Sequence, residues 1–108
     1  MDATSFENLA EETLETLFEG IDEAIGDDAD VDFDNGILNI ELEDGCQYVI
    51  NKHAPNMQIW MSSPFSGATH YAYDEEAEAW VSTRGGDALL DVLNGEIGKI
   101  AGEDVRLG

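Results

Sequence analysis

The sequence predicts an α+β fold, a two-layer sandwich in which an N-terminal and a C-terminal helix pack on one face of an antiparallel sheet of five to six strands. Three observations predict it. Apolar residues recur at helical spacing at both ends of the chain, apolar and polar residues alternate in the middle, and tight-turn sequences separate the alternating runs. Strands joined by tight turns pair antiparallel, and two amphipathic helices then need one face of that sheet. A chain of 108 residues is expected to form a single domain over residues 1–108.

The first helix is predicted from about Ser5 to Ile25. Residues three or four positions apart form one stripe along it: Phe6, Leu9, Ala10, Thr13, Leu14, Leu17, Ile21 and Ala24. Thr4 is the expected N-cap, because Glu7 three residues later completes a capping box. Gly26 follows the last apolar residue and is the expected end.

Six short strand-like runs follow the first helix. They are residues 30–34, 37–42, 46–51, 58–62, 70–73 and 79–82. Asn35-Gly36, between the first two runs, is the strongest short hairpin signal, and Asp44-Gly45 offers a second tight turn. Pro55 interrupts the chain between the third and fourth runs. These signals predict neighbouring antiparallel strands in chain order.

The last segment is again helical, and Asp87 is its expected N-cap. Its core-facing residues are Leu89, Leu90, Leu93, Ile97 and Ile100. Gly95 and Gly98 each weaken this helix by roughly 1 kcal/mol relative to Ala, so packing has to hold it together. Residues 105–107 are expected to add a terminal extended stretch.

The charge of the chain is strongly unbalanced, with 25 Asp and Glu against 4 Lys and Arg and a formal net charge of −21. Such a field repels nucleic acid and anionic membrane and attracts cations or basic protein surfaces. No apolar run approaches the roughly 20 residues needed to cross a bilayer. The acidic N-terminus lacks the basic residues of a targeting peptide. We therefore expect a cytoplasmic protein, or a mitochondrial-matrix one if a presequence has been removed.

The acids are concentrated on the first helix and the first strand. On the helix they form a ladder opposite the apolar stripe: Glu12, Glu15, Glu19, Asp22 and Glu23. The ladder continues through the following turn and strand: Asp27, Asp28, Asp30, Asp32 and Asp34. Carboxylates are ligands for hard and borderline cations, and without clustered His or Cys the expected site is shallow, hydrated, multiple and weak. A solvated acidic face and a cation-binding face both remain open from composition alone.

One calcium-loop pattern is rejected. Asp30, Asp32, Asp34 and Glu41 match positions 1, 3, 5 and 12 of an EF-hand loop. The required glycine at position 6 is Asn35, and apolar–polar alternation puts a strand where the entering helix belongs. We interpret the match as coincidence.

Other single residues carry weaker signals. Cys46, the only cysteine, excludes an internal disulfide and is interpreted as a small core or edge residue. His53 and His70 are candidate ligands or pH-responsive groups, and equally ordinary strand residues. The serines have no nucleophile-elbow context and no identifiable His–Asp relay, so nothing in the sequence supports a hydrolase. They are Ser62, Ser63 and Ser66.

The stretch from Tyr48 to Gly67 reads YVINKHAPNMQIWMSSPFSG and resembles the motif of the frataxin family. In that family the run is Tyr-Val-Ile-Asn-Lys, a Pro-containing turn, Gln-Ile-Trp, then Ser-Pro and Ser-Gly. Further matching positions are Asn35-Gly36-Ile37-Leu38, Tyr71, Trp80-Val81 and Leu89-Leu90. The resemblance covers nearly the whole chain. One departure is Ala68-Thr69-His70, where eukaryotic members usually carry a basic pair.

The resemblance implies the same sandwich fold and a role in iron–sulfur cluster assembly. Frataxins bind ferrous and ferric iron on an acidic ridge and associate with a cysteine desulfurase and an iron–sulfur scaffold protein. Carried over by position, the weak iron-binding ridge is Glu15, Glu19, Asp22, Glu23, Asp27, Asp28, Asp30, Asp32 and Asp34. The partner-binding residues on the sheet face are Asn51, Gln58 and Trp60.

Trp60 is expected on the open face of the sheet. Strand alternation places it with Gln58 and Ser62, and puts Ile59 and Met61 on the other face. An exposed Trp beside polar residues resembles an interface anchor, whereas a Trp in a small domain also often belongs to the core. The acidic ridge would then suit a basic patch on the partner.

Two other function classes remain open. An acidic protein of this charge is also compatible with a nucleic-acid mimic, or a generic cation binder, that occupies basic protein partners. Weak ferrous iron oxidation is possible by family resemblance, but no Glu-x-x-His pair indicates a dinuclear site, so we expect no enzyme. We expect a monomer, with iron-dependent oligomers possible. The sequence leaves open the iron affinity and whether cluster synthesis is activated or inhibited.

Overall fold

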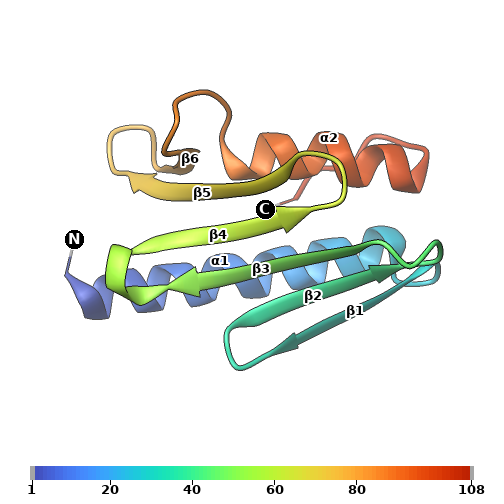
Figure 1. Cartoon of the computed structure of the whole chain (residues 1–108), viewed down its shortest axis with the longest axis horizontal. Coiled ribbons are helices and arrows are strands. Elements are labelled where there is room, and N and C mark those ends of the chain that lie inside the picture. Colours follow the sequence, from blue (N-terminus) through green and yellow to red (C-terminus); the bar gives the residue numbers. More distant parts are fainter. Residues whose placement is uncertain (1, 108) are drawn as a thin grey trace.

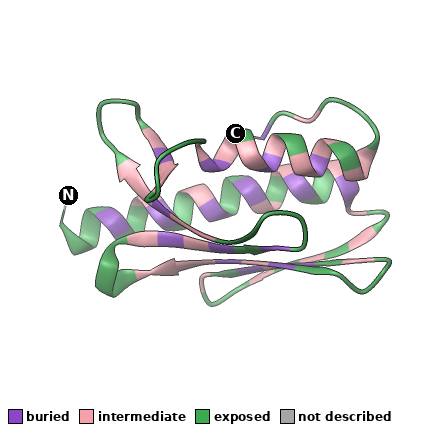
Figure 2. Ribbon diagram, turned by 45° about the horizontal axis from the view of Figure 1, so that its top comes forward, coloured by how far each residue is buried: buried purple, intermediate pink, exposed green. Residues whose placement is uncertain are grey.

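The computed structural model describes residues 2–107 and is a two-layer α+β sandwich (Figure 1). Its elements are α1 (Ala3–Ile25), β1 (Ala29–Asp34), β2 (Ile37–Leu42), β3 (Gln47–His53), η1 (Ala54–Asn56), β4 (Gln58–Ser63), β5 (Gly67–Asp74), β6 (Ala79–Ser82) and α2 (Leu89–Ala101). The six strands form one sheet in chain order, and every neighbouring pair is antiparallel. Both helices lie on the same face of this sheet (Figures 1 and 2). The predicted fold class is confirmed, with six strands.

Helix α1 begins two residues earlier than predicted. Its N-cap is Asp2, whose carboxylate accepts a hydrogen bond from the Ser5 backbone N–H at 2.8 Å. The predicted Thr4 cap is therefore wrong, because Thr4 already lies in the first turn. The same hydrogen bond from Ser5 holds the pKa of Asp2 below its usual value. The predicted stripe is correct, and its fully buried members are Phe6, Ala10, Leu14, Leu17 and Ile21.

The hairpins follow the turn residues in the sequence. Asn35 and Gly36 have φ angles of 53° and 75°, the pair of left-handed conformations that a two-residue hairpin turn requires. This turn fixes the register of β1 on β2, from Asp34 opposite Ile37 to Ala29 opposite Leu42. The alternation predicted along the strands is thereby converted into one buried face and one open face of the sheet.

The start of α2 differs from the prediction. Ala88 is the N-cap, without a side-chain hydrogen bond, so the predicted Asp87 cap is wrong. The backbone before the helix is held against β6 instead: Ser82 N–H donates to the Asp87 carbonyl at 3.3 Å, and Val81 forms an isolated bridge with Ala88. This pairing keeps the chain extended as far as Ala88, and the helix starts only at Leu89.

The segment after α2 runs along the helix layer and is not a strand. Leu107, only 5% exposed, belongs to the core cluster, and its backbone N–H donates to Asn94 Oδ1 at 2.7 Å. A Cβ at Gly20 of α1 would lie 2.8 Å from the end of the Leu107 side chain. Gly20 therefore lets the end of the chain pack closely on α1.

Replacing Gly95 by Ala is expected to stabilise the protein by about 0.5–1 kcal/mol, because glycine weakens a helix interior. A Cβ at Gly95 would meet nothing within 4 Å, so no contact opposes the gain. Thermal unfolding should show a higher Tm. Gly98 is the matched control, because its Cβ would lie 3.1 Å from the Glu103 carbonyl oxygen. An equal gain at both positions would contradict this account.

Glu96 connects α2 to the sheet through a partly buried hydrogen-bond network. Its Oε1 accepts hydrogen bonds from the Tyr48 hydroxyl at 2.7 Å and from Ser63 Oγ at 2.6 Å. Ser63 Oγ in turn accepts the backbone N–H groups of Phe65 and Ser66 at 3.0 and 3.1 Å. Burial, and then the Glu96 carboxylate, raise the pKa of Tyr48, so this tyrosine remains a hydrogen-bond donor. The network fixes the β4–β5 turn relative to α2.

Candidate functional site

The predicted acidic residues of α1 all lie on the solvent side. Glu15, Glu19, Asp22 and Glu23 are exposed. Glu15 lies three residues before Phe18 and Asp22 four residues after it, so these three side chains share one face of the helix. Phe18 contacts Phe33 of β1 with ring centroids 6.1 Å apart. Part of the helical acid ladder therefore faces the β1 edge of the sheet.

The acids of β1 lie on the other side of the same edge. Val31 and Phe33 pack toward α1 and are partly buried against the core. Alternation then turns Asp30, Asp32 and Asp34 to the open face of the sheet, and all three are exposed. The ridge thus wraps around the β1 edge, with helical acids on one side and strand acids on the other.

A shallow hollow lies where α1 leads into β1 and β2 ends. It has a volume of about 330 Å³ and includes five carboxylates. They are Asp27, Asp28, Asp30, Glu41 and Glu43. Asp30 lies directly opposite Glu41 in the β1–β2 register. Glu41 and Glu43 are absent from the predicted ridge, although the Asn35-Gly36 hairpin implies the pairing that brings Glu41 to Asp30.

The ridge carboxylates do not form a closed metal cage. Within residues 2–107, no group of three or more His, Cys, Asp or Glu side chains converges well enough to hold a metal ion. Over the same residues, none of the nine predicted ridge acids forms an ion pair with a basic side chain. The arrangement can attract cations by its field and hold them through few carboxylates and water, with affinity limited by competing solvent.

The open face of the sheet carries a straight row of side chains across five strands. Successive cross-strand partners in this row are Asp34, Ile37, Asn51, Trp60 and His70. Ile37 is 40% exposed, which is high for a large apolar side chain in a strand. The predicted contact residues Asn51 and Trp60 are therefore direct neighbours, and the row joins them to an acid of the ridge.

Trp60 lies on the open face, as alternation predicts, but its indole is not bare. The His53 ring stacks on the indole with a distance of 3.7 Å between ring centroids, and the His70 ring stacks on it with a distance of 4.1 Å. Each imidazole is inclined to the indole by 9°. The indole Nε1–H donates to Gln58 Oε1 at 2.8 Å. Asn51 Nδ2 donates to the Lys52 carbonyl at 3.2 Å. The predicted contact residues are thus locally ordered, and Trp60 is half-buried by its two histidines.

The weaker sequence candidates have structural explanations. Cys46 is exposed, and its backbone N–H donates to the Asp44 carboxylate at 2.9 Å. Hydrogen bonding to Asp44, and then its charge, raise the pKa of the Cys46 thiol, which disfavours the reactive thiolate. Ser63 is buried and bonded to Glu96, and so has a structural role.

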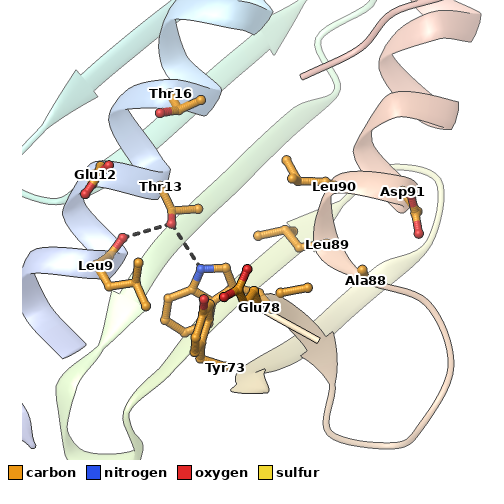
Figure 3. A pocket seen from close by; sticks show the side chains of 12 residues that line it. Leu9, Glu12, Thr13, Thr16, Tyr73, Glu78, Ala88, Leu89, Leu90 and Asp91 are labelled. Carbon is orange, nitrogen blue, oxygen red and sulfur yellow. Dashed lines mark hydrogen bonds between the residues drawn. The ribbon is translucent and has the colours of Figure 1, made fainter. Parts of the chain in front are cut away.

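A separate hollow of about 360 Å³ lies in the helix layer, between α1, the β5–β6 hairpin and the start of α2 (Figure 3). Trp80 forms part of its wall, and its Nε1–H donates to Thr13 Oγ1 at 3.0 Å. The Thr13 hydroxyl donates in turn to the Leu9 carbonyl at 2.8 Å. Its lining contains no histidine, cysteine or lysine. This hollow shares no residue with the predicted ridge or with the row on the open sheet face.

Comparisons with known proteins agree with the fold and with the residues that carry the resemblance. The family model of the frataxin-like domain matches residues 1–103. The chain belongs to the frataxin family. It is 39% identical over 105 residues to the iron-sulfur cluster assembly protein CyaY of Thioalkalivibrio sulfidiphilus, covering 95% of this chain and 96% of that one. It is 40% identical over 98 residues to the mitochondrial frataxin homolog of Schizosaccharomyces pombe, covering 87% of this chain and 62% of that protein.

Solved frataxin structures have the same fold. Frataxin from Psychromonas ingrahamii superposes with a TM-score of 0.82 at 30% identity, over 98% of this chain and 97% of that chain. A trimeric frataxin from the yeast Saccharomyces cerevisiae, complexed with ferrous iron, superposes with a TM-score of 0.72 at 33% identity, over 95% and 88% of the two chains. Neither helix in the described part of this chain combines the length and apolar character that a membrane span requires.

Proposed function

We propose that this frataxin-family chain, as one domain over residues 1–108, binds iron weakly on its acidic ridge and docks on a cysteine desulfurase–scaffold complex. In this role it regulates iron–sulfur cluster assembly or supplies iron for it. The observation that carries the proposal is the set of nine exposed ridge carboxylates without basic partners, beside an open sheet face that contains Trp60. The names of its relatives support the assembly role.

The proposed iron sites are the ridge acids Glu15, Glu19, Asp22, Glu23, Asp27, Asp28, Asp30, Asp32 and Asp34. Glu41 and Glu43 complete the hollow at the end of β2 and join this set. Binding of ferrous iron to a yeast relative supports iron as the cation. The lack of a convergent cluster in residues 2–107 favours weak, hydrated binding of labile iron over a permanent cofactor.

Ferrous iron under anaerobic conditions is expected to raise the Tm. A cation bound only by the folded state stabilises it by mass action and also reduces the repulsion between ridge acids. Each kcal/mol gained should raise Tm by roughly 4–8 °C. Changing Glu19, Asp22 and Glu23 together to Lys should remove most of this iron-dependent shift.

The matched control changes Glu7, Glu76 and Glu103 to Lys, which alters the net charge by the same amount outside the proposed ridge. It should retain the iron-dependent shift. If both triple variants lose the shift equally, iron responds to total charge and the ridge assignment is wrong.

A pull-down from native cell extract tests the docking role. Recovery of a cysteine desulfurase and a scaffold protein supports the proposal. Recovery of nucleic-acid-binding proteins, without desulfurase or scaffold, would support the acidic-mimic alternative instead. We expect no appreciable oxygen consumption with ferrous iron above the protein-free rate, because the ridge offers no convergent dinuclear site within the described residues.

A further inference from the structure

Both histidines of the chain stack on one tryptophan. His53, Trp60 and His70 come from the neighbouring strands β3, β4 and β5, and their rings lie nearly parallel, with centroids 3.7 and 4.1 Å apart. Each face of the indole is therefore covered by one imidazole. In a chain of net charge −21, the only two side chains that ordinarily gain positive charge between about pH 8 and about pH 5 flank the same ring.

The stack orders the Trp60 side chain. Its two faces contact His53 and His70, and its only N–H group donates to Gln58 at 2.8 Å. A partner approaching the open sheet face meets the edges of three parallel rings rather than an indole face. Because the orientation of the indole is already fixed, little side-chain entropy is lost when a partner binds it.

The environment of His53 makes the stack sensitive to protonation. His53 Nδ1 is buried and has no hydrogen-bond partner among the described residues. In a neutral ring this nitrogen can remain a bare acceptor. Protonation of the ring adds an N–H donor there without an acceptor, and leaving a buried donor without a hydrogen bond is unfavourable. The favourable response is for His53 to leave the indole and reach water.

Charged groups lie around the stack but do not supply the missing acceptor. Asp34 ends the cross-strand row of Trp60 on the β1 side. Lys52 neighbours His53 on β3, and Arg84 follows Thr83, whose N–H donates to the His70 carbonyl at 2.9 Å. His53, Gln58 and Ala72 are cross-strand neighbours on β3, β4 and β5. Three acids lie close to Ala72, namely Asp74, Glu75 and Glu76.

We propose that His53 and His70 are positioning residues for Trp60, and that they make docking of the open sheet face proton-dependent. The neutral imidazoles hold the indole in its docking orientation, and protonation of His53 opens the stack and weakens docking. The proposal rests on the proposed docking of this face on the desulfurase–scaffold complex. It adds a regulation of that site by pH.

The opening of the stack can be measured without a partner. The imidazole protons of His53 and His70 lie over the indole, so NMR spectra at about pH 8 should show ring-current shifts that Trp60→Leu removes. When the spectra are recorded again at about pH 5.5, these shifts should be lost for those His53 rings that have become protonated. If His53 is protonated and keeps its ring-current shifts, the stack tolerates the charge and the proposal is overturned.

Docking is then measured with purified desulfurase–scaffold complex at the same two pH values. The wild-type affinity should fall about threefold to tenfold more than that of a His53→Phe/His70→Phe variant, which keeps ring stacking but cannot be protonated. Because the partner and the acidic ridge titrate identically with both proteins, the difference isolates the two histidines. Equal pH dependence would overturn the proposal.

A His53→Gln/His70→Gln variant separates positioning from titration. It lacks the stack at every pH, so it should dock more weakly than wild type at about pH 8 and show little further loss on acidification. If wild type does not dock even at about pH 8, the proposed function itself fails, and the docking part of this inference fails with it. The NMR spectra decide separately whether the stack opens.

Discussion

Replacing Glu96 by leucine is expected to lower the free energy of unfolding by about 2–4 kcal/mol. The change removes the acceptor of the Tyr48 hydroxyl and of Ser63 Oγ, and both residues are buried. Each orphaned buried donor costs roughly 1–3 kcal/mol, whereas leucine adds little new contact on the partly exposed Glu96 position. Urea or thermal unfolding followed by circular dichroism measures the loss.

Glu96→Gln is the matched control. Its side-chain carbonyl oxygen can still accept both hydrogen bonds, so the expected loss is about 1 kcal/mol or less. Tyr48→Phe removes one donor together with its need for a partner, and should also cost less than Glu96→Leu. If glutamine and leucine destabilise the protein equally, the two hydrogen bonds do not account for the effect.

The fold could be predicted from the sequence because its signals are local and agree with one another. The apolar stripe of α1, the Asn35-Gly36 turn and the alternation along each strand all specify the same sandwich. The first residues of the two helices were predicted less accurately than the order of the helices and strands. Thr4 and Asp87 satisfy the capping pattern, but Asp2 caps α1 two residues earlier, and the Asp87 carbonyl accepts a hydrogen bond from the Ser82 N–H of β6. Pairing with β6 overrides the capping preference of Asp87.

The residues of the candidate site could be predicted from composition and from the resemblance. Their arrangement in space could not, because it depends on the register in which the strands pair. Alternation placed Trp60 and the β1 acids on the open face, which the structure confirms. His53 and His70 were singled out as candidate ligands or pH-responsive groups, but their stacking on Trp60 was not predicted, because it depends on which residues of β3, β4 and β5 become neighbours. Glu41 was considered only as part of the rejected calcium-loop pattern and was left out of the predicted ridge. Its pairing with Asp30 nevertheless brings it to the acidic hollow.

The register also relates the two proposed surfaces. Asp34 and Trp60 belong to one cross-strand row and are separated by β2 and β3. Neighbouring strands are about 4.8 Å apart, so this separation is roughly 14 Å. A standard interface buries about 800 Å² on each partner, which is wide enough to include both residues. One basic partner surface can therefore contact the strand acids and the Trp60 stack together.

Replacing Trp60 by Ala is expected to weaken docking on the desulfurase–scaffold complex by about thirtyfold or more, equivalent to at least about 2 kcal/mol. The indole is the largest side chain of the open-face row, and its orientation is fixed by His53, His70 and Gln58. Truncation removes the central ring and leaves both imidazoles without support. Isothermal titration calorimetry or surface plasmon resonance with the purified complex measures the loss.

Phe65 provides the matched control for an exposed aromatic residue. It is 58% exposed, lies in the β4–β5 turn and contacts Tyr48, at 6.4 Å between ring centroids, away from the open-face row. Phe65→Ala should therefore change the affinity by less than about threefold. Unfolding curves of both variants establish that each is folded at the temperature of the binding measurement. Equal losses from Trp60→Ala and Phe65→Ala would place the docking surface elsewhere, because loss of any exposed aromatic ring would then have the same effect as loss of the stacked indole.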